Sequence, residues 1–397
     1  MKGGIKLKIT GIEIIPLTIS FKGQIKESFG TVGLREDDVI IRLHTDEGIT
    51  GLGEGSTLGP FYSGESQETV MGIIGHHLFP KVLEGQDPFN IDPIHCQMNK
   101  VVYGNTVAKA AVDFALYDIM GKALHVPVYN LLGGRFTDEI PIRGSVGIDT
   151  PENMAALAKS IVDQGFTGIK MKVGLNPPED IERVKAIREA IGSSPVINID
   201  VNGAYTPKEA IYVLNRVSDC APITVEQPVH RDNLTGMALV KRSVDLPIGA
   251  CESALTHAQI MRVIQMEAAD FFNYKPSRSG GLFPAKQAVR MIEAAGLFVI
   301  ASEQLGFGVE VTANAHLGVS TSTLKWPEGH AAGLMGIAGK FDTIGFTGDI
   351  VDNSPLVQNG HLKAPGGPGL GVNLVEEMWR RYLTPGKEII TLGRLSE

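Results

Sequence analysis

Hydrophobic and polar positions alternate along the first part of the chain. Between residues 5 and 54, segments such as GIEIIPLTI and DDVIIRLHTDEG are rich in β-branched residues and end at Gly or Asp turns, a pattern typical of β-strands. From about Glu65 to Leu132 the apolar residues recur instead at every third or fourth position, and this helical spacing stops at Gly133–Gly134. The pattern therefore predicts an α+β unit over residues 1–135.

Short apolar runs and amphipathic helical stretches then alternate. GIKMKVG is followed by DIERVKAIREAIG, PVINIDVN is followed by PKEAIYVLNRVS, and the alternation continues to LFVIASEQ. Strands that alternate with helices indicate a parallel sheet, and seven or more such units in succession favour a (β/α) barrel over an open sheet. We therefore predict an α/β barrel over residues 136–340. The Gly-, Pro- and Asn-rich segment 341–397 is predicted to form loops and short strands that pack back on the N-terminal unit.

Ionisable side chains end the predicted barrel strands at a steady interval of 28, 26, 26, 23 and 28 residues. These side chains are Lys172, Asp200, Glu226, Glu252, Lys275 and Glu303. In a barrel the carboxyl ends of all strands meet at one mouth, where active sites of this fold lie. The spacing therefore predicts that the six side chains gather at one site.

Three of these strand ends carry carboxylates, namely Asp200, Glu226 and Glu252. A single carboxylate at such a position is best interpreted as a solvated strand end. Three in register would repel one another unless a cation lay among them, and oxygen ligands favour Mg²⁺, or Mn²⁺, over zinc. We therefore predict a magnesium site.

Lys170 and Lys172 share one face of a predicted strand, because residues two apart in a strand point the same way. Lys275 ends a strand on the far side of the barrel. A lysine beside a metal and a second ammonium is pushed towards its neutral form, so Lys172 and Lys275 are predicted to act as bases near neutral pH. Lys170 is predicted to bind a substrate carboxylate, and Asn202 to orient a ligand or contact the substrate.

The composition excludes several classes of protein. The chain has 397 residues with 43% apolar and 20% charged positions, which is ordinary for a globular protein with a large core. Its net charge of −8 leaves no basic surface for nucleic acid. The first residues predict neither a signal peptide nor a membrane span. Three cysteines without CxxC spacing predict no disulfide framework, so we expect a cytoplasmic protein.

Five spaced motifs carry a family resemblance: KMK (170–172), NIDVN (198–202), VEQP (225–228), CES (251–253) and KPSRSGG (275–281). Their order resembles that of the enolase superfamily, specifically the muconate lactonizing enzyme (muconate cycloisomerase) subgroup of the mandelate racemase/muconate lactonizing enzyme family. The resemblance implies a modified (β/α)₇β TIM-like barrel with an α+β N-terminal capping domain, and a homo-oligomer. It also implies Mg²⁺-dependent proton transfer alpha to a carboxylate, through a metal-stabilised enolate.

The resemblance also implies roles for individual residues. Asp200, Glu226 and Glu252 match metal ligands, Lys172 and Lys275 match paired acid/base lysines, and Lys170 matches the first lysine of the KxK motif. Two positions depart from the family pattern. Cys251 stands where the subgroup usually has an Asp ligand, so Glu252 is predicted to be the ligand and Cys251 a packed side chain. Glu303 needs a shift to align with the family glutamate and is predicted either to contact the substrate or to pair with Lys275.

Several reactions on a small-molecule carboxylate fit these residues. The first is a muconate cycloisomerase-type reaction. The alternatives are a racemase or epimerase of an amino acid derivative (an N-acyl amino acid, a dipeptide or a betaine) and a carboxylate dehydratase. A catalytically silent binding protein is the remaining class. The substrate is predicted to lie under two capping loops, against Ser28, Phe29, Phe61 and Tyr62.

Overall fold

The capping domain is built on an antiparallel sheet. The computed structural model describes residues 6–32, 34–221, 223–322, 346–355 and 357–396. The sheet has four strands in the order β16-β1-β4-β5, namely β1 (Ile9–Ser20), β4 (Arg35–Thr45), β5 (Thr50–Gly55) and β16 (Ile390–Gly393). A separate hairpin between β1 and β4 is formed by β2 (Ile25–Glu27) and β3 (Gly30–Val32).

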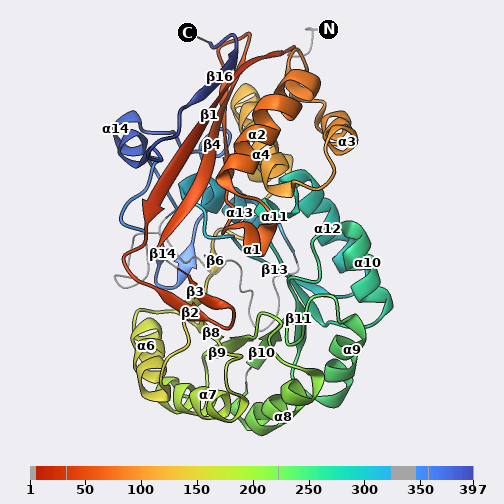
Figure 1. Cartoon of the computed structure of the whole chain (residues 1–397), viewed down its shortest axis with the longest axis vertical. Coiled ribbons are helices and arrows are strands. Elements are labelled where there is room, and N and C mark those ends of the chain that lie inside the picture. Colours follow the sequence, from red (N-terminus) through yellow and green to blue (C-terminus); the bar gives the residue numbers. More distant parts are fainter. Residues whose placement is uncertain (1–5, 33, 222, 323–345, 356, 397) are drawn as a thin grey trace.

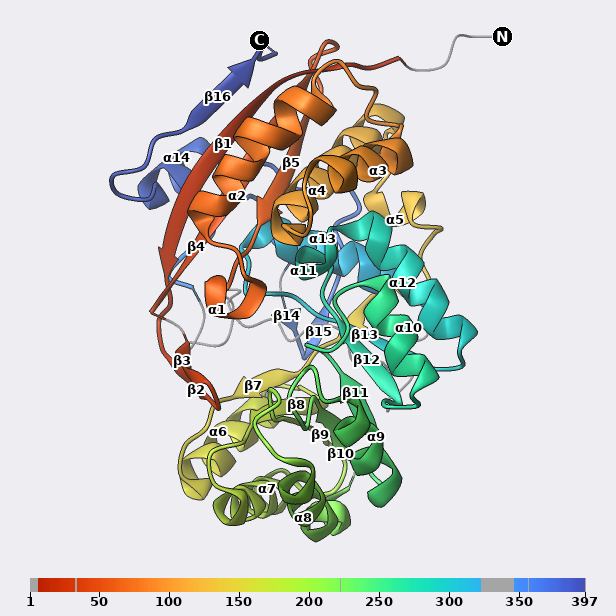
Figure 2. The same ribbon diagram turned by 45° about the vertical axis from the view of Figure 1, so that its right-hand side comes forward.

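Helices cover one face of this sheet (Figures 1 and 2). They are α2 (Gln67–Ile73), the π-helical η1 (Ile74–Leu83), α3 (Ile91–Val101) and α4 (Thr106–Leu124). Helix α4 packs directly on the backbone of β5, since a Cβ at Gly53 would lie 1.9 Å from the carbonyl oxygen of Ala111. Glycine at this position therefore allows the helix to approach the sheet closely.

The barrel is a curled parallel sheet whose strands follow one another in chain order from β7 to β13. Its strands are β7 (Gly144–Val146), β8 (Gly168–Lys172), β9 (Val196–Asp200), β10 (Ile223–Glu226), β11 (Ile248–Ala250), β12 (Phe271–Tyr274) and β13 (Phe298–Ala301). The outer layer in Figures 1 and 2 includes the helices α6 (Pro151–Asp163), α7 (Pro177–Ile191), α8 (Pro207–Val217), α9 (Leu234–Ser243), α10 (His257–Gln265) and α12 (Leu282–Ala294).

The central strands β8, β9 and β10 are buried along their whole length. Strands of a parallel barrel have helices on one face and the barrel interior on the other, so both faces are covered. The pairing sets Lys172 beside Asp200, and Asp200 beside Glu226. The predicted strand ends therefore lie side by side at one end of the sheet.

The remaining elements are short or connect the two domains. They are α1 (Pro60–Ser63), α5 (Val128–Leu131), β6 (Ile140–Pro141), η2 (Ser218–Cys220), α11 (Pro276–Ser279), α13 (Gly308–Val319), β14 (Val357–Gln358), β15 (His361–Leu362), α14 (Glu376–Trp379) and η3 (Arg380–Tyr382). In the described part of the chain, no helix is long and apolar enough to cross a membrane.

The α/β class, the parallel sheet and the α+β cap are as predicted. The predicted helical stretch from about 65 to 132 is divided into several helices, because the chain turns at Gly85 and Gly104, which have φ angles of 77° and 64°. The segment after residue 341 does reach the cap, where β16 pairs with β1. The domain boundary at 135 stays a prediction, and the boundary at 340 lies outside the described residues.

Candidate active site

The carboxyl ends of the barrel strands enclose a cavity that the β2–β3 hairpin and the cap close from above. Its lining includes five of the six side chains predicted from the strand-end spacing, namely Lys172, Asp200, Glu226, Lys275 and Glu303, together with Lys170 and Asn202. Glu252 does not line the cavity and reaches it through Asn202, whose amide donates to Glu252 Oε1 at 2.9 Å. The structure thus brings the predicted groups to one site.

Lys170 lies between two of the carboxylates. Its Nζ is 2.9 Å from Asp200 Oδ2 and 2.9 Å from Glu226 Oε2. All three side chains are buried. The predicted role of Lys170 was to bind a substrate carboxylate, whereas here its ammonium is matched by the chain's own acids.

Lys172 also has two carboxylate partners. Its Nζ lies 2.8 Å from Asp200 Oδ2 and 3.0 Å from Glu27 Oε1, and it donates to Asn202 Oδ1 at 3.0 Å. Asn202 takes a left-handed backbone conformation (φ 49°), which Asn tolerates better than most residues. This turn lets its backbone N–H donate to Asp200 Oδ1 at 3.1 Å while its side chain joins Lys172 to Glu252.

These ion pairs determine the protonation states. Burial disfavours the ammonium of Lys172, but the carboxylates of Asp200 and Glu27 outweigh burial, and the pKa of Lys172 lies well above its usual value. Burial likewise raises the pKa of Asp200, but Lys170 and Lys172 outweigh it and leave that pKa below its usual value. The neutral Lys172 that is expected beside a metal and a second ammonium stays a prediction, while Asp200 and Glu27 favour its ammonium form in this charge arrangement.

Lys275 lies against the cap. Its Nζ is 5.0 Å from the centre of the Tyr62 ring, a cation–π distance. The Tyr62 hydroxyl accepts from Arg278 Nη1 at 2.8 Å, and Arg278 Nη2 donates to the carbonyl oxygen of Cys251 at 2.8 Å. Arg278 thereby links Tyr62 of the cap to Cys251 of the barrel, and Tyr62 lines the cavity.

Cys251 is a packed side chain, as predicted. It is 1% exposed, and burial raises the pKa of its thiol to about 12. Glu252 is also buried, and its Oε2 has no hydrogen-bond partner in the described structure. A protonated thiol is a poor ligand for a hard cation, whereas a free carboxylate oxygen suits one.

The donor set fits Mg²⁺ in its chemistry, since Asp200, Glu226 and Glu252 offer only carboxylate oxygens and one of these has no partner. The described side chains are not arranged around a metal, however: among them no three His, Cys, Asp or Glu groups are placed to hold an ion together. Lys170 occupies the space between Asp200 and Glu226.

Only some of the residues predicted to line the substrate site lie in the lining of the cavity. Phe29 and Tyr62 line the cavity. Phe61 is 58% exposed and packs its ring 5.1 Å from that of Phe29, outside the lining. Ser28 is not in the lining either, because its hydroxyl donates to the carbonyl oxygen of Val201 at 3.1 Å. Glu303 lines the cavity, and its Oε2 accepts from the backbone N–H of Leu305 at 2.6 Å.

Sequence reasoning missed other cavity residues, namely Glu27, Leu58, Ser145, Ser302 and Leu305. Ser145 belongs to none of the five motifs. Glu27 lies in the cap and so has no place in the regular spacing of the barrel strand ends. Glu27 and Leu58 do lie in the two capping loops, near residues 20–35 and 55–65, that are predicted to cover the substrate, and Ser302 stands next to Glu303 at a predicted strand end.

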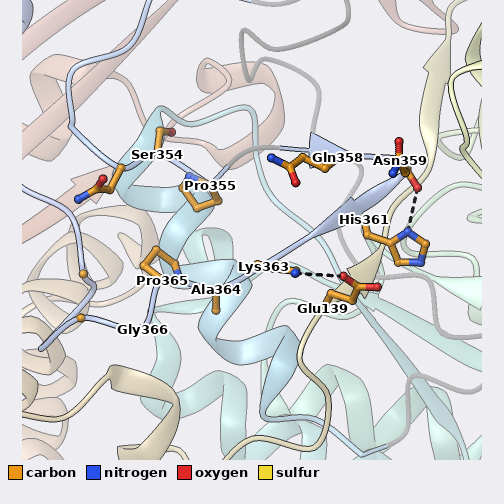
Figure 3. A pocket seen from close by; sticks show the side chains of 13 residues that line it. Glu139, Ser354, Pro355, Gln358, Asn359, His361, Lys363, Ala364, Pro365 and Gly366 are labelled. Atoms are coloured by element: carbon orange, nitrogen blue, oxygen red, sulfur yellow. Dashed lines mark hydrogen bonds and ion pairs between the residues drawn. The ribbon is translucent and has the colours of Figure 1, made fainter.

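A second hollow lies beside β14 and β15 (Figure 3). Lys363 Nζ is 3.7 Å from Glu139 Oε2 there, and His361 Nδ1 is 2.8 Å from the carbonyl oxygen of Asn359. Its charged groups thus pair with each other or with backbone, and it gathers none of the residues predicted from the barrel. The cavity at the strand ends is therefore the candidate active site.

Comparison with known proteins agrees with this fold. Residues 11–133 match the "Mandelate racemase / muconate lactonizing enzyme, N-terminal domain" family, and residues 153–378 match the "Enolase C-terminal domain-like" family. The chain therefore belongs to the mandelate racemase/muconate lactonizing enzyme family of the enolase superfamily, which confirms the resemblance seen in its motifs.

Individual relatives narrow the class. The N-succinyl-L-Arg/Lys racemase of Bacillus cereus is 35% identical over 79% of this chain and 85% of its own, and its crystal structure superposes with a TM-score of 0.88 over 96% of this chain and 100% of its own, at 32% identity. The structure of the dipeptide epimerase of Cytophaga hutchinsonii, solved with Mg and the dipeptide D-Ala-L-Val, superposes with a TM-score of 0.87. It is 31% identical and covers 97% of this chain and 99% of its own.

A muconate cycloisomerase of Pseudomonas putida is 29% identical over 87% of this chain and 90% of its own. Because such relatives are racemases, epimerases and cycloisomerases, the protein is an isomerase of the enolase superfamily. The higher identity to the racemase favours the racemase or epimerase alternative over the cycloisomerase reaction predicted first.

Proposed function

We propose that the protein is a Mg²⁺-dependent racemase or epimerase that inverts the α-carbon of an N-acyl amino acid or a dipeptide. The observation that carries the proposal is the position of Lys172 and Lys275 in the lining of one cavity, at the end of β8 and directly after β12, two strands that are not neighbours in the barrel. Two lysines on opposite sides of a carbon can remove a proton from one face and return one to the other.

The chain's own residues divide this work. Lys172 is the acid/base for one face of the α-carbon and Lys275 for the other. Asn202 holds the Nζ of Lys172 through a 3.0 Å hydrogen bond, so that its position is fixed before substrate binds. Tyr62 lies against Lys275 and excludes water from that side, since it is 7% exposed.

Asp200, Glu226 and Glu252 would hold the metal. Mg²⁺ bound there would supply positive charge to the substrate carboxylate and so make the neighbouring α-proton more acidic. Lys170 lies between Asp200 and Glu226 and adds a further positive charge on the same side. Support for Mg²⁺ comes from the carboxylate-only donor set and from relatives that were solved with Mg.

The test is proton NMR in D₂O with Mg²⁺, using N-acyl amino acids, dipeptides and cis,cis-muconate. We expect the wild type to exchange the α-proton for deuterium and to interconvert the two enantiomers or epimers. Lys172→Ala and Lys275→Ala should each slow interconversion by about a hundredfold or more. Each variant should keep exchange of only one stereoisomer, and the two variants should keep opposite ones.

Two results would contradict the proposal. Conversion of muconate to a lactone, without exchange of any amino acid derivative, would return the assignment to a cycloisomerase. Full interconversion in both lysine variants would show that neither lysine is needed to transfer the α-proton. Circular dichroism of the variants serves as the control for folding.

A further inference from the structure

The β2–β3 hairpin of the cap is attached to the barrel on both sides of Glu27. The carbonyl oxygen of Lys26 accepts from the backbone N–H of Ile148, in the loop after β7, at 2.7 Å. Ser28 donates to the carbonyl oxygen of Val201, in the loop after β9, at 3.1 Å. Residues before and after Glu27 are therefore fixed to two different barrel loops, and the Glu27 side chain is directed into the cavity between them.

Glu27 is a buried carboxylate in the lining of the cavity. It is 5% exposed, its Oε1 lies 3.0 Å from the Nζ of Lys172, and the same Nζ lies 2.8 Å from Asp200 Oδ2. The carboxylate of Glu27 is thus a second partner for one ammonium. A carboxylate has several acceptor sites on its two oxygens, so Glu27 can accept a charge-assisted hydrogen bond from a further cation in the cavity besides the one from Lys172.

The neighbours of Glu27 suit a particular shape of ligand. Phe29, Leu58 and Leu305 also line the cavity and present apolar surface. Methylene groups can pack on such surface while a charged end reaches a carboxylate. The cavity therefore fits an aliphatic stem that ends in a cation better than it fits a second carboxylate.

The distances place this cation relative to the reaction. A substrate α-carbon in reach of Lys172 lies about 3 Å from its Nζ, and Glu27 is 3.0 Å from the same nitrogen, so roughly 6 Å separates Glu27 from the α-carbon at most. The free amino nitrogen of an extended dipeptide lies about 5 Å from the α-carbon of its second residue. A lysine side chain carries its ammonium to a similar distance.

We propose that Glu27 makes this site selective for substrates with a cationic nitrogen several bonds from the reacting α-carbon. The cation is either the free amino group of a dipeptide or the basic side chain of an N-acyl amino acid. This inference rests on the proposed function and adds the substrate class to it.

The experiment uses two matched pairs of substrates that differ only in the cation. N-succinyl-L-lysine is compared with N-succinyl-L-norleucine, and L-alanyl-L-alanine with propionyl-L-alanine, which lacks only the amino group. Exchange of the α-proton in D₂O is measured with the Mg²⁺-loaded wild type, with Glu27→Gln and with Lys26→Gln. Lys26 lies next to Glu27 in the same strand, but its side chain is exposed and outside the cavity, so it is the control for a charge change in the hairpin.

We expect the wild type and Lys26→Gln to prefer the cationic member of one pair by about tenfold or more in kcat/KM. Glu27→Gln should reduce that preference, measured as the ratio of kcat/KM for the two members of the pair, to about twofold or less. The pair that shows the preference identifies the source of the cation, a dipeptide amine or a basic side chain.

Other results overturn the inference in distinguishable ways. Equal losses on both members of a pair in Glu27→Gln would mean that Glu27 acts only by positioning Lys172. A wild type that exchanges both members equally would leave the proposed function standing and remove the selectivity. Absence of exchange for all four compounds in the wild type would overturn the proposed function and this inference together.

Discussion

At the scale of the residue, the CES motif contains the main departure from the family pattern. Cys251 stands in the usual ligand position, but its thiol is buried, protonated and in contact with Arg278 and Tyr62. Glu252 presents a buried oxygen without a partner. The carboxylate is thus the better ligand, and the thiol belongs to the packing around Tyr62.

This difference leads to a prediction for metal binding. Glu252→Gln should weaken Mg²⁺ affinity by about tenfold or more, because it removes an anionic ligand, whereas Cys251→Ser should leave the affinity nearly unchanged. Isothermal titration calorimetry measures both, and Asp200→Asn provides a positive control for loss of the site. If Cys251→Ser weakened Mg²⁺ binding and Glu252→Gln left it unchanged, Cys251 rather than Glu252 would be the ligand.

The site residues that could be predicted from the sequence are those on barrel strands. Lys172, Asp200 and Glu226 end buried strands at a regular interval, and the period alone indicated that they meet. Glu27 was missed because it comes from the cap, roughly one third of the chain away from its partner Lys172 in sequence, so no periodicity relates the two. Contacts between domains depend on docking, which local patterns do not encode.

At the scale of the element, glycines occupy two opposite environments. Gly281 precedes α12 with a φ of 112°, and a Cβ there would lie 2.3 Å from the Asp113 side chain. Asp113 in turn accepts from the backbone N–H of Phe283 at 3.2 Å and from that of Leu282, so it caps the start of α12. Gly72 lies inside α2, and nothing is within 4 Å of its Cβ position.

The two glycines form a matched pair for mutation. Gly281→Ala should lower the free energy of unfolding by more than about 1 kcal/mol, since it combines an unfavourable φ with a clash against the Asp113 side chain. Gly72→Ala should raise it by about 0.5–1 kcal/mol, because alanine favours a helix interior. Chemical denaturation of both variants checks this. A stabilised Gly281→Ala would mean that α12 begins elsewhere.

At the scale of the whole molecule, buried carboxylates lie where the cap meets the barrel. Glu36 and Asp38 on β4 and Glu54 on β5 face Glu310 on α13, and all four are buried. Glu54 Oε2 accepts from the backbone N–H of Glu310 at 2.7 Å, which joins the two domains. Burial raises the pKa of Glu36 and of Glu54 to about 8.

These shifted pKa values predict how stability depends on pH. Between about 4.5 and 8 the folded state holds protons that the unfolded state has released, so the free energy of unfolding should fall as pH rises through this window. Each such proton contributes up to about 1.4 kcal/mol per pH unit. Glu36→Gln, which keeps an acceptor for the backbone N–H of Leu58, should flatten the decline. Denaturation at several pH values tests this, and an unchanged slope would show that Glu36 is ionised in the folded protein.

More of the architecture than of the site could be predicted from the sequence, because seven buried strands and their helices repeat one local pattern. The sequence predicted that segment 341–397 packs back on the N-terminal unit, but not which strands pair there. Strand β16 pairs with β1, and Ile12 lies beside Leu392, yet nothing in the short run ITLG distinguishes it from other apolar runs. Such long-range pairing depends on which edge is left open after the domains dock.

That pairing has a consequence for synthesis on the ribosome. Strands β1, β4 and β5 emerge early and can associate at once, but the outer edge of β1 stays uncovered until residues 390–393 have been made. The entire barrel is translated in the interval. An unpaired, apolar strand edge is a template for association with other nascent chains, so the cap is exposed to aggregation for most of the time that the polypeptide is being elongated.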